Sequence, residues 1–179
     1  VTAISDCVNP SFFSPSQSAQ SVAELKSSLG IPPERQVVVY LGLLAQWQGT
    51  DLLLEAAATV LTRRPNTQFL IMGFPSVEIY RGLAQRLGLG DHTTFTDRIP
   101  YEQAPSYLSV GNVAVAPKMS TTEGSGKLLN YMAMGLPTVS FDVPVSREYL
   151  DGLGIYARPG DATSLAEALE LALTNAEDS

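Results

Sequence analysis

Residues 113–137, VAVAPKMSTTEGSGKLLNYMAMGLP, say most about the fold of this chain. An apolar segment at Val113–Ala116 predicts a buried strand. A loop rich in glycine follows, and a short helix is expected at about Lys127–Met134. Gly135, Leu136 and Pro137 end that helix, because glycine and proline interrupt helical backbone. A strand that runs through a glycine-rich loop into a helix predicts an α/β chain.

The loop itself predicts an anion site. Gly124 and Gly126 let the backbone come close to a ligand, and the first N–H groups of a helix have no acceptor within the helix. These donors and the positive end of the helix dipole attract a phosphate, and Lys127 adds a full positive charge. A plain structural turn, with a solvated Lys127, is the alternative interpretation.

The flanking sequence repeats the alternation of strand and helix. Strands are expected at Val37–Gly42, Gln68–Met72, Thr93–Thr96, Val113–Pro117, Pro137–Phe141 and Gly154–Ala157. Further helices are expected at Val22–Leu29, Thr50–Arg63, Val77–Leu87, Tyr101–Ser109, Val145–Leu150 and Thr163–Thr174. We therefore predict an α/β fold with three α/β/α layers: a Rossmann-like, doubly wound parallel sheet of about six strands in the order 3-2-1-4-5-6.

This strand order predicts where a ligand binds. In doubly wound sheets the ligand lies beyond the carboxyl ends of the strands, at the switch between the first and fourth strands. The loop Gly42–Gly49 follows the first strand and the loop Lys118–Gly126 follows the fourth. Both loops should therefore line one crevice.

Composition and length bound the class of protein. The chain has 179 residues, 45% of them hydrophobic and 16% charged, which suits one globular domain. Its net charge of −7 argues against a nucleic-acid partner. Residues 1–35 are expected to form a lead-in that packs on the sheet edge, and residues 36–179 the domain proper.

The same composition limits metal chemistry and localisation. One cysteine and one histidine exclude an internal disulfide and give no support to a metal site. No apolar run approaches the roughly 18 residues of a membrane span. The first residues show no signal-peptide pattern, so a cytoplasmic protein is expected.

Several motifs resemble one family, and together they cover nearly the whole chain. They are Ser5-Asp6-Cys7-Val8-Asn9, Tyr40-Leu41-Gly42, Gln48-Gly49-Thr50-Asp51-Leu52-Leu53, Leu70-Ile71-Met72-Gly73 and Tyr131-Met132-Ala133 with Gly135-Leu136-Pro137. The chain resembles the C-terminal, donor-binding half of a GT-B-fold retaining glycosyltransferase. This resemblance places residues 1–35 just after the interdomain hinge.

The resemblance implies a nucleotide-diphosphate sugar as donor substrate, with no further cofactor. A sugar or lipid-linked acceptor and part of the catalytic machinery would belong to an N-terminal domain that is absent from this chain. A lipid acceptor would place the full enzyme at the membrane surface.

Three departures from the family pattern bear on the site. The family usually has Arg and Lys at the positions of Leu43 and Gln48, where both contact the diphosphate. Its ribose-binding carboxylate falls at Asn130, which can still hydrogen-bond a hydroxyl. Its first carboxylate falls at Thr122, and a shift of one residue in the loop gives that role to Glu123. A sugar monophosphate would suit the reduced charge as well.

The candidate site residues follow from these positions. Glu123 is the candidate catalytic residue, and the ligand-binding candidates are Gly42, Gly49, Gly124, Ser125, Gly126, Lys127 and Asn130. Each has a structural alternative: a loop carboxylate, a tight turn, or an inward asparagine. Arg98 and Ile99 are either the rim of a base pocket or a surface loop, and Trp47 and Tyr131 are expected to pack in the core or at an interface.

Four functions compete. The first is the donor domain of a glycosyltransferase, inactive alone but able to bind nucleotide. The second is a non-catalytic nucleotide or sugar-phosphate binding module with a degenerate donor site, and the third is half of a nucleotide-sugar epimerase. A dehydrogenase is disfavoured because no G-x-G-x-x-G follows the first strand.

Overall fold

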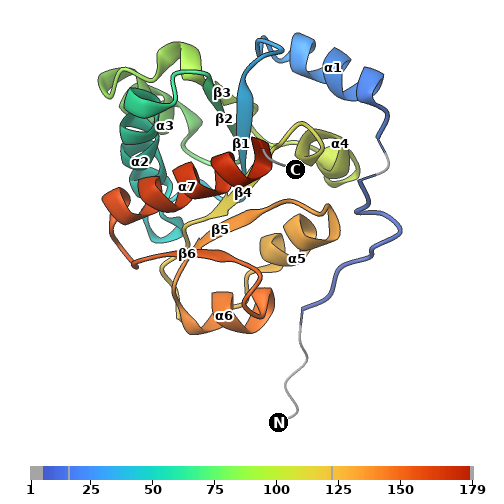
Figure 1. Cartoon of the computed structure of the whole chain (residues 1–179), viewed down its shortest axis with the longest axis vertical. Coiled ribbons are helices and arrows are strands. Elements are labelled where there is room, and N and C mark those ends of the chain that lie inside the picture. The colour runs from blue at the N-terminus through green and yellow to red at the C-terminus, as the bar shows by residue number, and fades with distance from the viewer. Residues whose placement is uncertain (1–5, 16, 122, 178–179) are drawn as a thin grey trace.

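A six-stranded parallel sheet forms the centre of the computed structural model, which describes residues 6–15, 17–121 and 123–177 (Figure 1). The strands are β1 (Gln36–Leu41), β2 (Thr67–Met72), β3 (Thr93–Phe95), β4 (Val113–Ala116), β5 (Thr138–Phe141) and β6 (Ile155–Ala157). Their order is β3-β2-β1-β4-β5-β6, and every neighbouring pair is parallel. The predicted doubly wound topology is confirmed.

Helices cover both faces of the sheet. One apolar layer joins the sheet to α2 (Thr50–Arg63), α3 (Val77–Arg86) and α7 (Ala162–Glu177), which lie together on the left of Figure 1. The other face carries α1 (Ala19–Ser28), α4 (Ala104–Leu108) and α5 (Gly126–Ala133). The remaining α-helix, α6 (Pro144–Leu150), follows β5. Because both faces are covered, the central strands read as continuous apolar runs.

The segment after β3 differs from the single helix expected at Tyr101–Ser109. A 3₁₀ turn at Tyr101–Gln103 comes first, and α4 begins only at Ala104. Pro105 lies in the first turn of α4, where its missing N–H leaves no helical hydrogen bond unmade. The proline therefore suits the start of a new helix better than the middle of a longer one.

The lead-in packs on a face of the sheet rather than on its edge. Phe13 and Ile31 are almost fully buried, in the same apolar cluster as Val37 and Val39 of β1 and Leu70 of β2. Phe12 and Phe13 also contact the ring of Tyr101. The described part of residues 1–35 therefore completes the core on this side.

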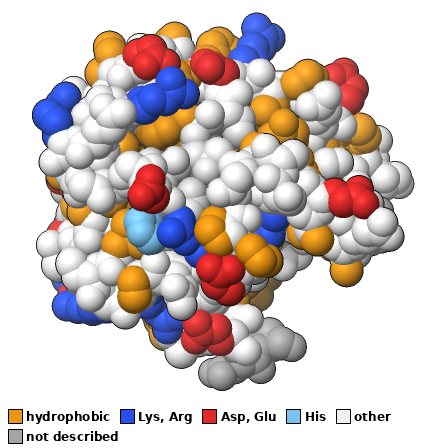
Figure 2. Space-filling model, turned by 90° about the horizontal axis from the view of Figure 1, so that it is seen from above, with side chains coloured by type: hydrophobic (Ala, Val, Ile, Leu, Met, Phe, Trp, Pro, Cys, Tyr) orange, Lys and Arg blue, Asp and Glu red, His pale blue; other side chains and the backbone are white. Residues whose placement is uncertain are grey.

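Charge is dispersed on the face seen in Figure 2, where acidic and basic side chains alternate with apolar ones. Within residues 6–15, 17–121 and 123–177, no helix combines the length and apolar character needed to cross a bilayer.

Candidate functional site

The loops that follow β1 and β4 lie against each other at the carboxyl ends of their strands. The N–H of Met119 donates to the carbonyl of Trp47 at 3.4 Å. Gly49 has a φ of 73°, and a Cβ there would overlap the carbonyl oxygen of Pro117. The contact between the two loops therefore requires glycine at position 49, whether or not a ligand also needs that space.

The region between these two loops, called the crevice below, begins where β1 and β4 stop pairing. Their register ends at the pair Val39 and Ala114. Beyond it, the Tyr131 hydroxyl from α5 accepts from the N–H of Leu41 at 2.8 Å and donates to the carbonyl of Val115 at 3.4 Å. Tyr131 is fully buried, and burial raises its pKa. Its hydroxyl replaces the missing strand hydrogen bonds at the switch point.

Lys127 reaches from the start of α5 into this crevice. Its Nζ lies 3.0 Å from Oε1 of Gln48, 3.4 Å from the hydroxyl of Tyr40 and 4.4 Å from the centre of the Tyr40 ring. Burial lowers the pKa of Lys127 to about 7, and repulsion from Lys118 adds to the shift. A Cβ on Gly42 would lie 2.5 Å from Nζ, so this glycine makes room for the ammonium.

Ser125 immediately precedes α5. It is only 6% exposed, and its hydroxyl has no hydrogen-bond partner among the described residues. A Cβ on neighbouring Gly126 would meet nothing within 4 Å, so the backbone at the helix start is open to a ligand. A buried, unpartnered hydroxyl beside open helix N–H groups is a combination that an anion would satisfy.

Glu123 is engaged with Lys118, a residue that sequence reasoning missed. Nζ of Lys118 lies 2.9 Å from Oε2 of Glu123 and 2.9 Å from the carbonyl oxygen of Gly124, and its side chain is only 9% exposed. The position was readable as a lysine directly after a buried strand at the switch point. The Glu123 side chain is itself exposed, so its pairing with Lys118 does not cover the carboxylate completely.

The remaining candidates have different surroundings. Asn130 is partly buried on α5, and no hydrogen bond to its side chain occurs within the described residues. Thr122 lies outside the described residues. Trp47 does not pack in the core: it is 47% exposed, in a 3₁₀ turn of the first loop, and its packing at an interface stays a prediction.

A small cavity of about 220 Å³ adjoins the crevice on the side of β2. It is lined by Leu41, Gly42, Leu43, Met72, Gly73, Phe74, Arg98 and Ile99. The guanidinium of Arg98 lies 4.9 Å from the centre of the Phe74 ring. Arg98 and Ile99 thus border a cavity that shares Gly42 with the crevice.

Other polar clusters do not converge on the crevice. His92 lies in a 3₁₀ turn before β3, where Nδ1 is 3.0 Å from the carbonyl of Thr67. Over the part of the chain that the structure describes, no three His, Cys, Asp or Glu side chains gather closely enough to hold a metal ion.

The fold is a doubly wound, Rossmann-like α/β domain, and comparison with known proteins identifies its family. The model of the family of glycosyl transferases group 1 matches residues 21–179, and the chain belongs to this family. A kanosaminyltransferase from Streptomyces kanamyceticus is 33% identical over 158 residues, which are 87% of this chain and 40% of that enzyme. The chain thus spans about two fifths of the length of this curated relative.

Solved structures agree on the fold. HepE from Anabaena, determined in complex with UDP-glucose, has a TM-score of 0.83 at 18% identity, over 95% of this chain and 47% of that one. The C-terminal domain of LpcC, a group 1 family protein from Francisella tularensis, has a TM-score of 0.76 at 21% identity, over 96% of this chain and 90% of that domain. The fold therefore corresponds to about half of HepE and to nearly all of the LpcC domain.

Proposed function

We propose that this chain is the donor-binding domain of a glycosyltransferase that transfers a sugar from a nucleotide-diphosphate sugar to an acceptor. The observation that carries the proposal is the start of α5. There the Lys127 ammonium, the buried unpartnered hydroxyl of Ser125 and the open backbone at Gly126 come from three consecutive residues. These groups suit a diphosphate.

Each part of a nucleotide sugar has a suitable place. The cavity beside Gly42, with Arg98 and Ile99 on its border, is suited to the base. Asn130 offers an amide to the ribose hydroxyls. Glu123 would contact the donor sugar. The family membership and the UDP-glucose bound to HepE support this assignment.

The position of Lys127 bears on the charges that the family usually places at residues 43 and 48. Leu43 and Gln48 carry none, yet Nζ of Lys127 lies 3.0 Å from the Gln48 side chain. Lys127, at the start of α5, thus supplies a cation directly beside Gln48, the position where the first loop lacks one. We expect a retained diphosphate site with its cation moved to α5.

A complete transferase would need more than this chain. The acceptor and the rest of the catalytic groups would come from an N-terminal domain, so we expect the isolated chain to bind nucleotide but to transfer little sugar. A non-catalytic binding module is the second candidate, because Glu123 is paired with Lys118 and Asn130 is uncharged.

Calorimetric titration with UDP, GDP, ADP and their sugar conjugates tests the proposal. We expect saturable binding of one nucleotide, weakened by about 1–3 kcal/mol in Lys127→Met because the phosphate loses a charged hydrogen-bond donor. Lys26→Met on α1 is the matched control and should bind normally. Absence of binding by the cooperatively folded chain would contradict the proposal, and binding without any transfer after the rest of the protein is supplied would favour the second candidate.

A further inference from the structure

One peptide group in the anion-binding loop is held from both sides. The carbonyl oxygen of Gly124 accepts from Nζ of Lys118 at 2.9 Å. In a trans peptide the carbonyl of one residue and the N–H of the next point in opposite directions. The N–H of Ser125 therefore points away from Lys118.

Tyr149 of α6 lies on that opposite side. A Cβ on Gly124 would be 3.0 Å from the Tyr149 hydroxyl, so the two are in close contact. Burial and a hydrogen bond with Asp6 raise the pKa of Tyr149. The same hydroxyl donates to Oδ2 of Asp6 at 2.9 Å. The lead-in is thereby linked to the loop.

Lys118 is built into the structure rather than placed on its surface. Its side chain is 9% exposed, and its Nζ lies 5.8 Å from the centre of the Trp47 ring in the other loop. Its second strong partner is the carboxylate of Glu123 at 2.9 Å. A buried ammonium that joins a carboxylate and a carbonyl in adjacent residues restricts the loop to one conformation.

We propose that Lys118 and Tyr149 are positioning residues that clamp the Gly124–Ser125 peptide and so fix the anion-binding loop. The part of this inference that concerns ligand binding rests on the proposed function. Lys118 holds the Gly124 carbonyl and sets the direction of the Glu123 carboxylate, and the Tyr149 hydroxyl packs against Gly124. The Ser125 hydroxyl and the start of α5 are thereby left to receive the anion.

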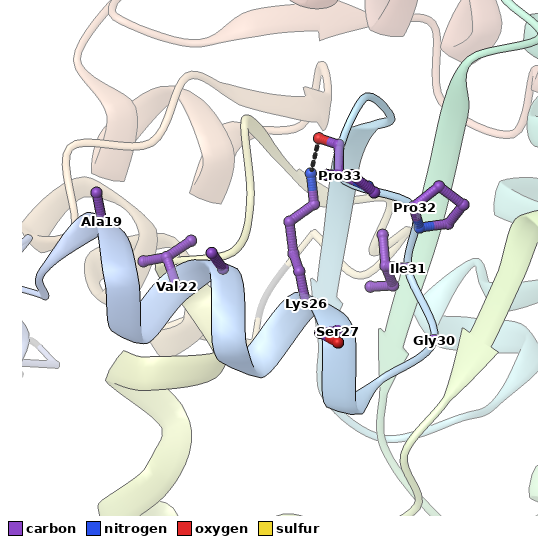
Figure 3. A pocket seen from close by; sticks show the side chains of 9 residues that line it. Ala19, Val22, Lys26, Ser27, Gly30, Ile31, Pro32 and Pro33 are labelled. Atoms are coloured by element: carbon purple, nitrogen blue, oxygen red, sulfur yellow. Dashed lines mark hydrogen bonds between the residues drawn. The ribbon is translucent and has the colours of Figure 1, made fainter.

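Amide hydrogen exchange of the ligand-free chain tests the clamp directly. We expect exchange of the Ser125 N–H to accelerate about tenfold in two variants, Lys118→Met and Tyr149→Phe. Lys118→Met removes the hydrogen bond to the Gly124 carbonyl, and Tyr149→Phe removes the hydroxyl that contacts Gly124 and binds Asp6. Lys26→Met is the matched control, since Lys26 also donates to two carbonyls: that of Pro33 at 2.9 Å (Figure 3) and that of Arg35 at 2.8 Å. It borders a separate cavity at the amino end of β1 and should leave Ser125 exchange unchanged.

Nucleotide titration of the same variants gives a second readout. Both clamp variants should bind UDP, or whichever nucleotide the parent prefers, about tenfold more weakly. In Lys118→Met the pH midpoint of binding should also rise, because the charge that repels Lys127 is gone, while Lys118→Arg keeps the midpoint of the parent. Tyr149→Phe should bind the nucleotide more weakly without a change in the pH midpoint of binding. A general loss of stability would not reproduce this difference between the two variants.

The outcomes separate the two proposals. Unchanged Ser125 exchange in both Tyr149→Phe and Lys118→Met would overturn the clamp, whatever the ligand. Accelerated exchange in a chain that binds no nucleotide would support the clamp and overturn the proposed function. If Lys118→Met does not fold, Ser125 exchange in Tyr149→Phe still decides the clamp: unchanged exchange would overturn it.

Discussion

At the scale of single residues, Lys127 holds a charge that its surroundings disfavour. Burial and repulsion from Lys118 lower its pKa to about 7, and Tyr40 and Gln48, its nearest partners, are uncharged. A bound phosphate would stabilise the ammonium and raise that pKa. Ligand binding and protonation of Lys127 should therefore be coupled.

We predict that nucleotide affinity falls as the pH rises above about 7, because a neutral Lys127 must take up a proton when the ligand binds. Calorimetry in buffers of different ionisation enthalpy measures this uptake. Lys127→Met should show weaker binding with little dependence on pH. Equal proton uptake in the parent and in Lys127→Met would assign the effect to another group.

The same pKa shift predicts how Lys127 affects stability. Its pKa of about 7 in the folded chain lies below the ordinary value of 10.5, so the unfolded chain binds more protons between these values. The free energy of unfolding should therefore rise with pH across that window. We expect Lys127→Met to be more stable than the parent below pH 7, on the order of 2 kcal/mol after allowance for partial exposure.

Urea unfolding at about pH 6.5 and about pH 9.5 checks this prediction. The advantage of Lys127→Met should shrink at the higher pH, where the parent has lost its buried charge. A constant difference at both values would mean that Lys127 keeps an ordinary pKa.

Tyr131 tests the switch point itself. Tyr131→Phe would leave the buried N–H of Leu41 and carbonyl of Val115 without their partner. We expect a loss of about 1–3 kcal/mol in the free energy of unfolding, measured in urea. The core packing of the ring is kept, so a cost near zero would show that the hydroxyl does not hold the two strands together.

At the scale of elements, two glycines at helix starts separate folding from ligand binding. Gly49, before α2, has a φ of 73° and lies against Pro117, so Gly49→Ala should cost several kcal/mol, about 2–4. Gly126, in α5, faces open space. Gly126→Ala should leave stability unchanged or raise it by about 0.4–1 kcal/mol.

The effect of Gly126→Ala on nucleotide binding should be the reverse of its effect on stability. A methyl group at residue 126 would occupy the approach of the anion, so Gly126→Ala should weaken nucleotide binding while its unfolding midpoint does not fall. Thermal unfolding and calorimetry on both variants check this pair. Normal binding by Gly126→Ala would place the ligand away from the start of α5.

The strands were predictable from the sequence for a physical reason. Segments such as Val37–Gly42 are buried on both faces, so nearly every residue in them is apolar. The break at Pro105 was missed because proline in a first helical turn looks, in sequence, like the interior of a longer helix. The glycine-rich loop and Lys127 were also visible, since local backbone chemistry defines an anion site.

The partners of Tyr149 and Lys127 were not predictable in the same way. Tyr149 lies in α6, and its link to Asp6 joins residues 143 positions apart. The contact of Lys127 with Gln48 likewise spans 79 positions. Such pairings follow from the packing of α5 and α6 around the switch point, and no local pattern in either segment encodes them.

At the scale of the whole molecule, the net charge opposes the proposed ligand. With a net charge of −7, the long-range field repels a diphosphate, so attraction must come from groups inside the crevice. Lys118 and Lys127 supply it, and of these only Lys127 has no carboxylate partner among the described residues. The site therefore relies on local, weakly screened interactions.

The lead-in and the sheet should unfold as one unit. Phe13 is fully buried in the apolar cluster that contains β1 and β2, and Asp6 is bound to Tyr149 of α6. Phe13→Ala would leave a cavity in that cluster, so we expect it to lower the free energy of unfolding by about 3–5 kcal/mol. Urea unfolding followed by fluorescence and by circular dichroism checks this, with both signals expected to show one coincident transition.

A matched change on the surface sharpens this test. Tyr101 is 60% exposed and packs on the outer side of the same aromatic group, so Tyr101→Ala should cost far less than Phe13→Ala. If Phe13→Ala instead unfolds in two steps, with the sheet retaining the stability of the parent, the lead-in is a separate unit. In that case the lead-in would still contact the anion-binding loop through Asp6 and Tyr149, but this contact would not contribute to the stability of the sheet.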